Sequence, residues 1–116
     1  MTDRINKLGQ LTKMVKDAEL ARLRELQENR HRVETLRAKL RQAQSDAYAA
    51  VAFDPAHLTG ADLRWQGWAS TRLQDLSTEL AQAAAEAEAQ KARARQAFGR
   101  DQALSKLAAR LAQTKP

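Results

Sequence analysis

Few residues in this 116-residue chain have the types and spacing that catalysis or metal binding requires. His31 has one carboxylate, Glu34, three residues later, and His57 has none three or four residues later. A single histidine–carboxylate pair on a charged surface is typical of solvated side chains, because a protein zinc site takes three or four ligands. The chain has no cysteine and no phosphate-binding or nucleophile motif. The sequence therefore predicts no catalytic residue, no metal site, no cofactor and no enzyme.

The basic residues make acidic partners attractive, since the formal charge is +6 and the isoelectric point is near 10.2. Basic runs occur at 30–32, 37–41 and 91–95, but glutamates are interspersed among them. Arginines two residues apart on a helix point in divergent directions and do not build one stripe. We therefore predict that nucleic acid is not a partner. A narrow apolar stripe also disfavours binding to a membrane surface.

The two tryptophans, Trp65 and Trp68, stand out in "HLTGADLRWQGWASTRL" at 57–73. Trp65 could pack with Tyr48, Phe53 and Leu58 to close one end of a helical hairpin. Trp68 could stack on a neighbouring arginine, or it could be an exposed anchor for a partner protein, because exposed tryptophans are common at interface hot spots. Both interpretations of Trp68 stay open.

Two long helices must position these residues. The composition is rich in helix-forming residues, and no proline falls between Ile5 and Val51. We predict helices over about 5–51 and 61–112, joined by a turn over about 52–60. Phe53 and Asp54 should leave the first helix ahead of Pro55. Thr59 and Asp62 form a capping pattern, so the second helix should begin near Gly60.

Apolar residues at alternating three- and four-residue spacing predict that the helices pack as an antiparallel coiled coil, an all-α hairpin forming one domain over 1–116. The expected register pairs residues whose numbers add up to about 112. A polar layer of Glu19 and Arg22 should meet Gln90 and Arg93, with an ion pair between Glu19 and Arg93. The seam of the first helix is predicted at Ile5, Leu8, Val15, Leu26, Val33, Leu36, Leu40, Ala43, Ala47 and Ala50. The seam of the second is predicted at Ala69, Leu73, Leu76, Leu80, Ala83, Ala87, Gln90, Ala94, Ala97, Asp101, Leu104, Ala108 and Leu111.

A two-helix hairpin buries little apolar surface for its length, so a partner is expected. No segment has the apolar length of a signal peptide or a membrane span, which leads us to expect a cytoplasmic protein. One possible partner is a second copy of the chain, which would make the protein a homodimeric coiled-coil adaptor or chaperone.

The chain also resembles the FliJ family of flagellar type III export and the related YscO-like stalk proteins of virulence secretion. The resemblance covers about Leu11 to Leu111 and is strongest in "LRWQGWASTRLQDL", where the family tends to carry an aromatic-x-x-aromatic element at the start of its second helix.

The resemblance implies a central stalk at the cytoplasmic face of the export apparatus. One partner would be the hexameric export ATPase, contacted by the helix ends, and another the cytoplasmic domain of the export gate protein, contacted by the hairpin tip. Export chaperones are a further expected partner, and the membrane would be reached only through partners. The implied gate-binding residues are Tyr48, Trp65 and Trp68. The implied ATPase-binding residues are Lys7, Leu8, Lys13, Arg100, Leu104 and Leu107.

Overall fold

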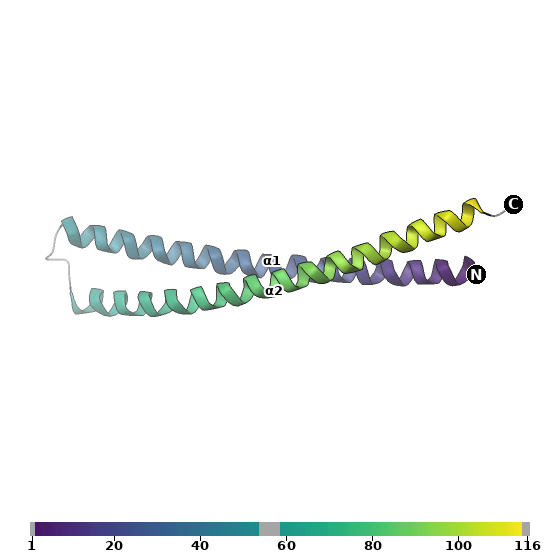
Figure 1. The fold of residues 1–116 in the computed structure, drawn as a ribbon. Coiled ribbons are helices and arrows are strands. Elements are labelled where there is room, and N and C mark those ends of the chain that lie inside the picture. The colour runs from purple at the N-terminus through teal and green to yellow at the C-terminus, as the bar shows by residue number, and fades with distance from the viewer. Residues whose placement is uncertain (1, 54–58, 115–116) are drawn as a thin grey trace. The chain divides into compact units, whose positions relative to one another are not determined.

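The computed structural model describes residues 2–53 and 59–114, which form two long antiparallel helices and contain no strand (Figure 1). α1 spans Thr2–Phe53 and α2 spans Gly60–Gln113. The predicted all-α hairpin is confirmed. The expectation that Phe53 leaves the first helix is wrong, because the steric restriction imposed by Pro55 acts on the residue directly before it. That residue, Asp54, lies outside the described residues, as does most of the predicted turn.

The start of α2 is fixed by a reciprocal cap, as the sequence predicts. The amide of Asp62 donates to Thr59 Oγ1 at 3.2 Å, and the amide of Thr59 donates to Asp62 Oδ2 at 3.0 Å. The amide of Leu63 also donates to the carbonyl of Thr59 at 3.1 Å. These bonds satisfy backbone donors that a helix N-terminus otherwise leaves free. A short acidic side chain therefore serves in the place usually taken by glutamate.

The helix pair comprises two compact units, and each is described by itself. Unit 1 contains Met1–Gln27 and Ala85–Pro116, and unit 2 contains Glu28–Ala84. Each unit consists of one stretch of α1 packed antiparallel to one stretch of α2. The expectation of a single domain stays a prediction.

The seam of α2 lies where the sequence predicts it. Ala69, Leu76 and Ala83 are buried in unit 2, and Ala87, Ala94 and Ala97 are buried in unit 1. The other predicted members are buried or half-buried as well. The register is also confirmed within two residues: Thr12 bonds to Asp101 in unit 1, and Arg37 bonds to Ser77 in unit 2.

The seam of α1 differs from the predicted one at five of its ten predicted members. Leu8, Val15, Leu36, Ala43 and Ala50 were expected inside, and all five are exposed. The seam keeps a strict heptad and takes the next residue along instead, at Gly9, Lys16, Arg37, Gln44 and Val51. Long polar side chains can lie there because their stems cover apolar surface while their heads find partners. Arg37 Nε donates to Ser77 Oγ at 3.0 Å, and Gln44 Nε2 donates to Ser70 Oγ at 3.1 Å.

A polar layer crosses the seam of unit 1, with different partners from those predicted. Gln90 is buried, and its Nε2 donates to the carbonyl of Glu19 at 3.0 Å and to the Glu19 carboxylate. Arg93 forms no ion pair with Glu19 among the described residues, and Arg22 pairs with Glu25 on the surface at 3.2 Å. Arg93 lies one turn beyond the carboxylate, whereas the Gln90 amide can donate to the backbone and the side chain together.

Candidate functional site

The two tryptophans form one exposed pair on α2 in unit 2. Their ring centroids are 6.4 Å apart and the ring planes are tilted by 43°. A spacing of three residues brings them to the same side of the helix. Trp65 is 36% exposed and Trp68 is 56% exposed. Trp65 therefore lies at the edge of the helix contact, whereas Trp68 offers most of its ring to the surroundings.

A shallow groove of about 330 Å³ runs beside Trp68. Its apolar lining comes from both helices and includes Leu36 and Leu40 of α1 and Leu76 of α2. Lys39 and Arg72 add positive charge to its border, although Arg72 is also 3.5 Å from the carboxylate of Glu79. An aromatic ring beside an apolar groove with basic borders is suited to anchoring a protein segment. No described residue forms a cation–π contact with Trp68, so its predicted stacking on an arginine is absent from the described part of the chain.

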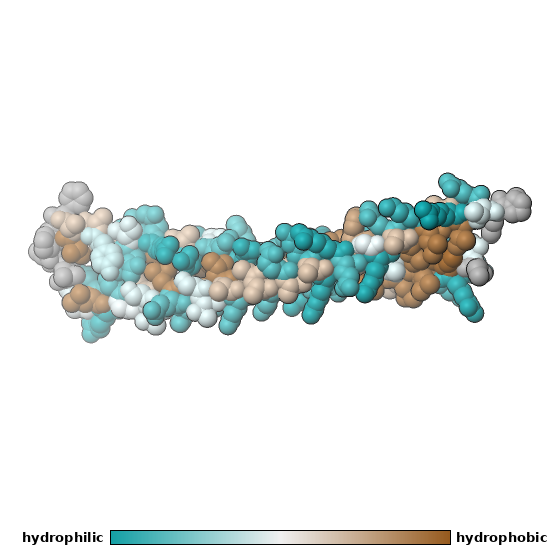
Figure 2. Space-filling view, in the orientation of Figure 1, coloured by the Kyte–Doolittle hydropathy of each residue, from teal (hydrophilic) through white to brown (hydrophobic). Residues whose placement is uncertain are grey.

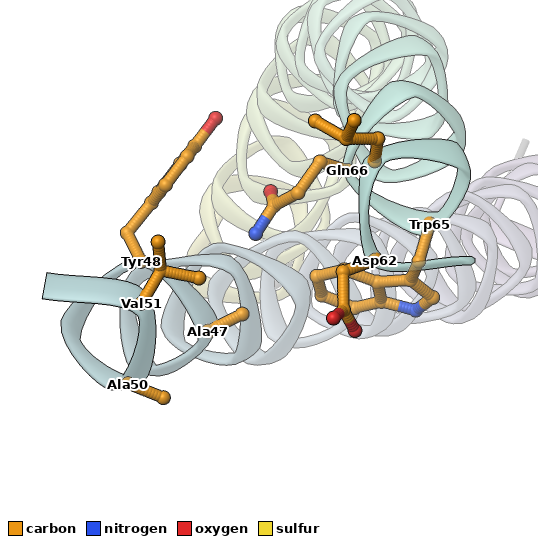
Figure 3. A pocket seen from close by; sticks show the side chains of 8 residues that line it. Ala47, Tyr48, Ala50, Val51, Asp62, Trp65 and Gln66 are labelled. Atoms are coloured by element: carbon orange, nitrogen blue, oxygen red, sulfur yellow. The ribbon is translucent and has the colours of Figure 1, made fainter. Parts of the chain in front are cut away.

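Tyr48 belongs to a different surface of unit 2. A pocket of about 360 Å³ lies between the helices near the end of α1 (Figure 3), and both Tyr48 and Trp65 line it. Figure 3 shows Gln66 directed between the helices, with Tyr48 on one side of it and Trp65, next to Asp62, on the other. Trp65 thus links the predicted gate-binding residues: it shares this pocket with Tyr48 and its ring pair with Trp68, whereas Tyr48 does not line the groove beside Trp68. The predicted packing of Phe53 and Leu58 against them lies outside the described side chains.

The side-chain oxygen of Gln66, Oε1, is buried in this pocket. It is the one buried side-chain polar atom of the described residues that has no hydrogen-bond partner. A buried acceptor without a partner typically costs about 1–3 kcal/mol. Gln66→Leu is therefore expected to raise the free energy of unfolding by about 1 kcal/mol, measured by urea denaturation. Gln74→Leu is the matched control, because Gln74 is exposed. Equal effects of the two substitutions would show that the buried acceptor is not responsible.

The predicted ATPase-binding residues all fall in unit 1, but they do not form one surface. Leu8, Arg100 and Leu107 are exposed on one flank of the helix pair, because each immediately precedes a seam residue. Lys13 follows a seam residue and so lies on the opposite flank. The other two are Leu104, half-buried in the seam, and Lys7, exposed on the side of α1 away from α2.

The sequence reading missed Leu11 and Met14, which are exposed apolar residues of unit 1. The spacing of Leu8, Leu11 and Val15 already contained the signal for Leu11, since residues three and four apart share a helix face. That stripe lies one position to the side of the seam. Leu8 and Val15 were assigned to the seam because their stripe and the true seam repeat with the same period.

Histidine and acidic residues are not clustered in the described part of the chain. The described residues contain no group of three or more histidine, cysteine or acidic residues that could hold a metal ion. His31 is exposed, and His57 lies outside the described residues. Neither α1 nor α2, over its described length, is apolar enough to cross a membrane.

Compared with models of protein families, with curated proteins and with solved structures, the chain matches none. The resemblance to the FliJ family therefore stays a prediction.

Proposed function

We propose that this chain is a non-enzymatic central-stalk component of a flagellar-type III export apparatus. It links the hexameric export ATPase to the cytoplasmic domain of the export gate protein and promotes assembly or activity of the ATPase. The observation that carries the proposal is an exposed apolar anchor in each of the two units: the tryptophan pair in unit 2, and the surface around Leu8 and Leu107 in unit 1. Two separate anchors suit a protein that holds two partners.

In this proposal, unit 1 engages the ATPase. The exposed Leu8 and Leu107 supply apolar contact, and Arg100 supplies a positive charge that an acidic surface would complement. Unit 2 engages the gate protein, with Trp68 seated in an apolar recess of that partner and its own groove receiving a side chain in return. Export chaperones would compete for one of these surfaces. The protein would act at the cytoplasmic face of the apparatus and approach the membrane only through its partners.

The hydrolysis rate of the export ATPase from the same organism, measured with and without this protein, tests the proposal. We expect the protein to stimulate hydrolysis, Trp68→Ala to retain the stimulation, and Arg100→Glu with Leu107→Glu to abolish it. Lys106→Glu is the matched control, because Lys106 is exposed on the side of α2 away from α1. The proposal fails if the protein neither binds nor stimulates the ATPase, or if only Trp68→Ala removes the stimulation.

A homodimeric adaptor is the second candidate function, favoured by the exposure of Leu36 and Trp68 on the same surface of unit 2. In such a dimer, the tryptophan pair of one copy would cover the groove of the other. Sedimentation equilibrium combined with tryptophan fluorescence separates the two candidates. A monomer with red-shifted, quenchable emission agrees with the stalk, and a dimer with blue-shifted emission agrees with the adaptor.

A further inference from the structure

Unit 1 carries a second apolar stripe on α1, beside the seam. Leu8, Leu11 and Val15 are each about half exposed, and Ala18 continues the stripe at the same spacing. Residues three and four apart lie on one face of a helix, so these four form a continuous ridge of about three turns. α2 does not cover this ridge, because its seam packs on Gly9, Thr12 and the seam residues that follow.

α2 contributes apolar residues to the same flank. The register places Gly9 against Leu104, whose Cδ2 would lie 4.0 Å from a Cβ at Gly9. In an antiparallel pair, the residues that directly precede the facing seam residues lie on the same side. Leu107 therefore borders the ridge from across the seam, with Ala103 one turn away, and both are exposed. We call this surface the unit 1 flank: the ridge together with Ala103 and Leu107. Figure 2 shows brown, apolar side chains gathered in this part of the molecule.

The unit 1 flank is bordered by arginines. Arg4 and Arg22 stand at the two ends of the ridge on α1, and Arg93, Arg100 and Arg110 stand on α2, at the same helical spacing. Arg22 is paired with Glu25 at 3.2 Å, whereas none of the other arginines forms an ion pair among the described residues. No acidic residue occupies the positions of this face from 4 to 22 or from 93 to 110. The surface thus combines an apolar centre with positive borders on which, of the described arginines, only Arg22 is in an ion pair.

This combination selects one kind of occupant. A second copy of the chain would bring its own arginines against these, and like charges in contact oppose association. Nucleic acid would engage the arginines but leave the apolar centre without a partner. A helix with an apolar stripe between two rows of aspartate or glutamate satisfies both features. We propose that the unit 1 flank binds an acidic amphipathic helix of a partner protein, which packs alongside α1 and α2 as a third helix. The inference rests on the proposed function, which makes unit 1 a partner-binding end, and adds the chemistry of the segment bound there.

Synthetic peptides test the chemistry with the full-length chain and without the ATPase. The first peptide is a fluorescently labelled helix of about three heptads, with leucine at two positions of each heptad and glutamate on both borders. The second is the same peptide with lysine in place of glutamate. Fluorescence anisotropy should show binding of the glutamate peptide at micromolar concentration, weakened by added sodium chloride. The lysine peptide should not bind.

Two pairs of variants locate the site. Leu11→Glu should weaken binding of the glutamate peptide at least about tenfold, and Arg100→Glu should weaken it several-fold. Met14→Glu and Lys106→Glu are the matched controls on the outward sides of the same helices and should leave binding unchanged. All four positions are exposed, and circular dichroism of each variant checks that the helix content is retained.

Three results would overturn the inference: equal binding of both peptides, binding of neither, or a loss of binding that Met14→Glu reproduces. A stable dimer disrupted by Leu11→Glu would also overturn it, because a second copy would then be the occupant. The peptide assay and the ATPase assay fail independently. If the protein stimulates the ATPase but does not bind the peptide, the proposal of an acidic helix is wrong and the stalk proposal stands. If it binds the peptide but not the ATPase, the stalk proposal is wrong and the unit 1 flank still binds an acidic helix.

Discussion

Leu76→Ala is expected to lower the free energy of unfolding of unit 2 by about 3 kcal/mol. Leu76 is 2% exposed and is the largest fully buried side chain of the described residues. The substitution removes three buried carbon atoms and leaves a cavity that two helices can close only in part, because each backbone is held by its own hydrogen bonds. The same loss in a large globular protein would be one of many core contacts. Here it removes a major part of a thin core.

Leu76→Ala should leave part of the protein unfolded without urea, in addition to lowering the urea concentration at the unfolding midpoint. Helix pairs of this kind have little stability in reserve, so a loss of this size approaches the whole stability of the unit. Urea denaturation followed by circular dichroism gives the free energy, and hydrogen exchange shows whether unit 2 opens before unit 1.

Leu63→Ala is the matched control for Leu76→Ala, since Leu63 is 58% exposed in the same helix of the same unit. It should change the free energy of unfolding by less than about 0.5 kcal/mol. If the two substitutions destabilise the protein equally, helix propensity rather than burial governs its stability.

The seam of α2 from Ala69 onward could be predicted because nearly all its members are apolar and follow one heptad period. Gln90 and Asp101 were assigned to it only because they continue the heptad between alanines and leucines. Both occupy the seam, Gln90 buried and Asp101 half-buried. At these two positions, the heptad spacing predicted the seam correctly, whereas the polarity of the side chain would have placed the residue outside it.

The seam of α1 could not be predicted in the same way. There the apolar residues Leu8, Val15 and Leu36 stand one position before the true seam and repeat with the same period, so a reading that follows apolar side chains selects the neighbouring stripe. Which of two neighbouring stripes faces the partner helix depends on the side chains of that helix. Alanines and serines of α2 leave room for the long side chains of Lys16 and Arg37, and this is information that α1 alone does not carry.

The candidate site was predictable to a similar degree. The shared face of Trp65 and Trp68 follows from their spacing, and the exposure of Trp68 was one of the two interpretations left open. The separation of Tyr48 from the tryptophans could not be foreseen. It depends on the corrected seam of α1, in which Val51 takes the place of Ala50 beside Ala47, so that Tyr48 falls on the opposite flank from Trp65.

Asp101→Ala is expected to lower the free energy of unfolding of unit 1 by about 2 kcal/mol. Asp101 Oδ2 accepts a hydrogen bond from Lys16 Nζ at 3.0 Å, and its Oδ1 accepts one from Thr12 Oγ1 at 3.4 Å. The side chains of Lys16 and Asp101 are only 20% and 18% exposed. Removing the carboxylate leaves the ammonium in the seam with the ring of Phe98, 5.9 Å away, as its remaining favourable contact among the described residues.

Asp17→Ala is the control for the loss of an acidic residue, because Asp17 is exposed in the same unit, and it should have little effect. Thermal and urea denaturation of both variants measure the difference.

Replacing both partners, with Lys16→Leu and Asp101→Leu together, separates two roles of the pair. Since a partly buried ion pair contributes little net stability against apolar residues of similar size, the double variant should be at least as stable as the parent. A double variant as unstable as Asp101→Ala would mean that the pair itself stabilises unit 1. A stable double variant would leave the pair the role of fixing the register, because an ion pair across the seam forms at one alignment of the helices and a leucine pair tolerates others.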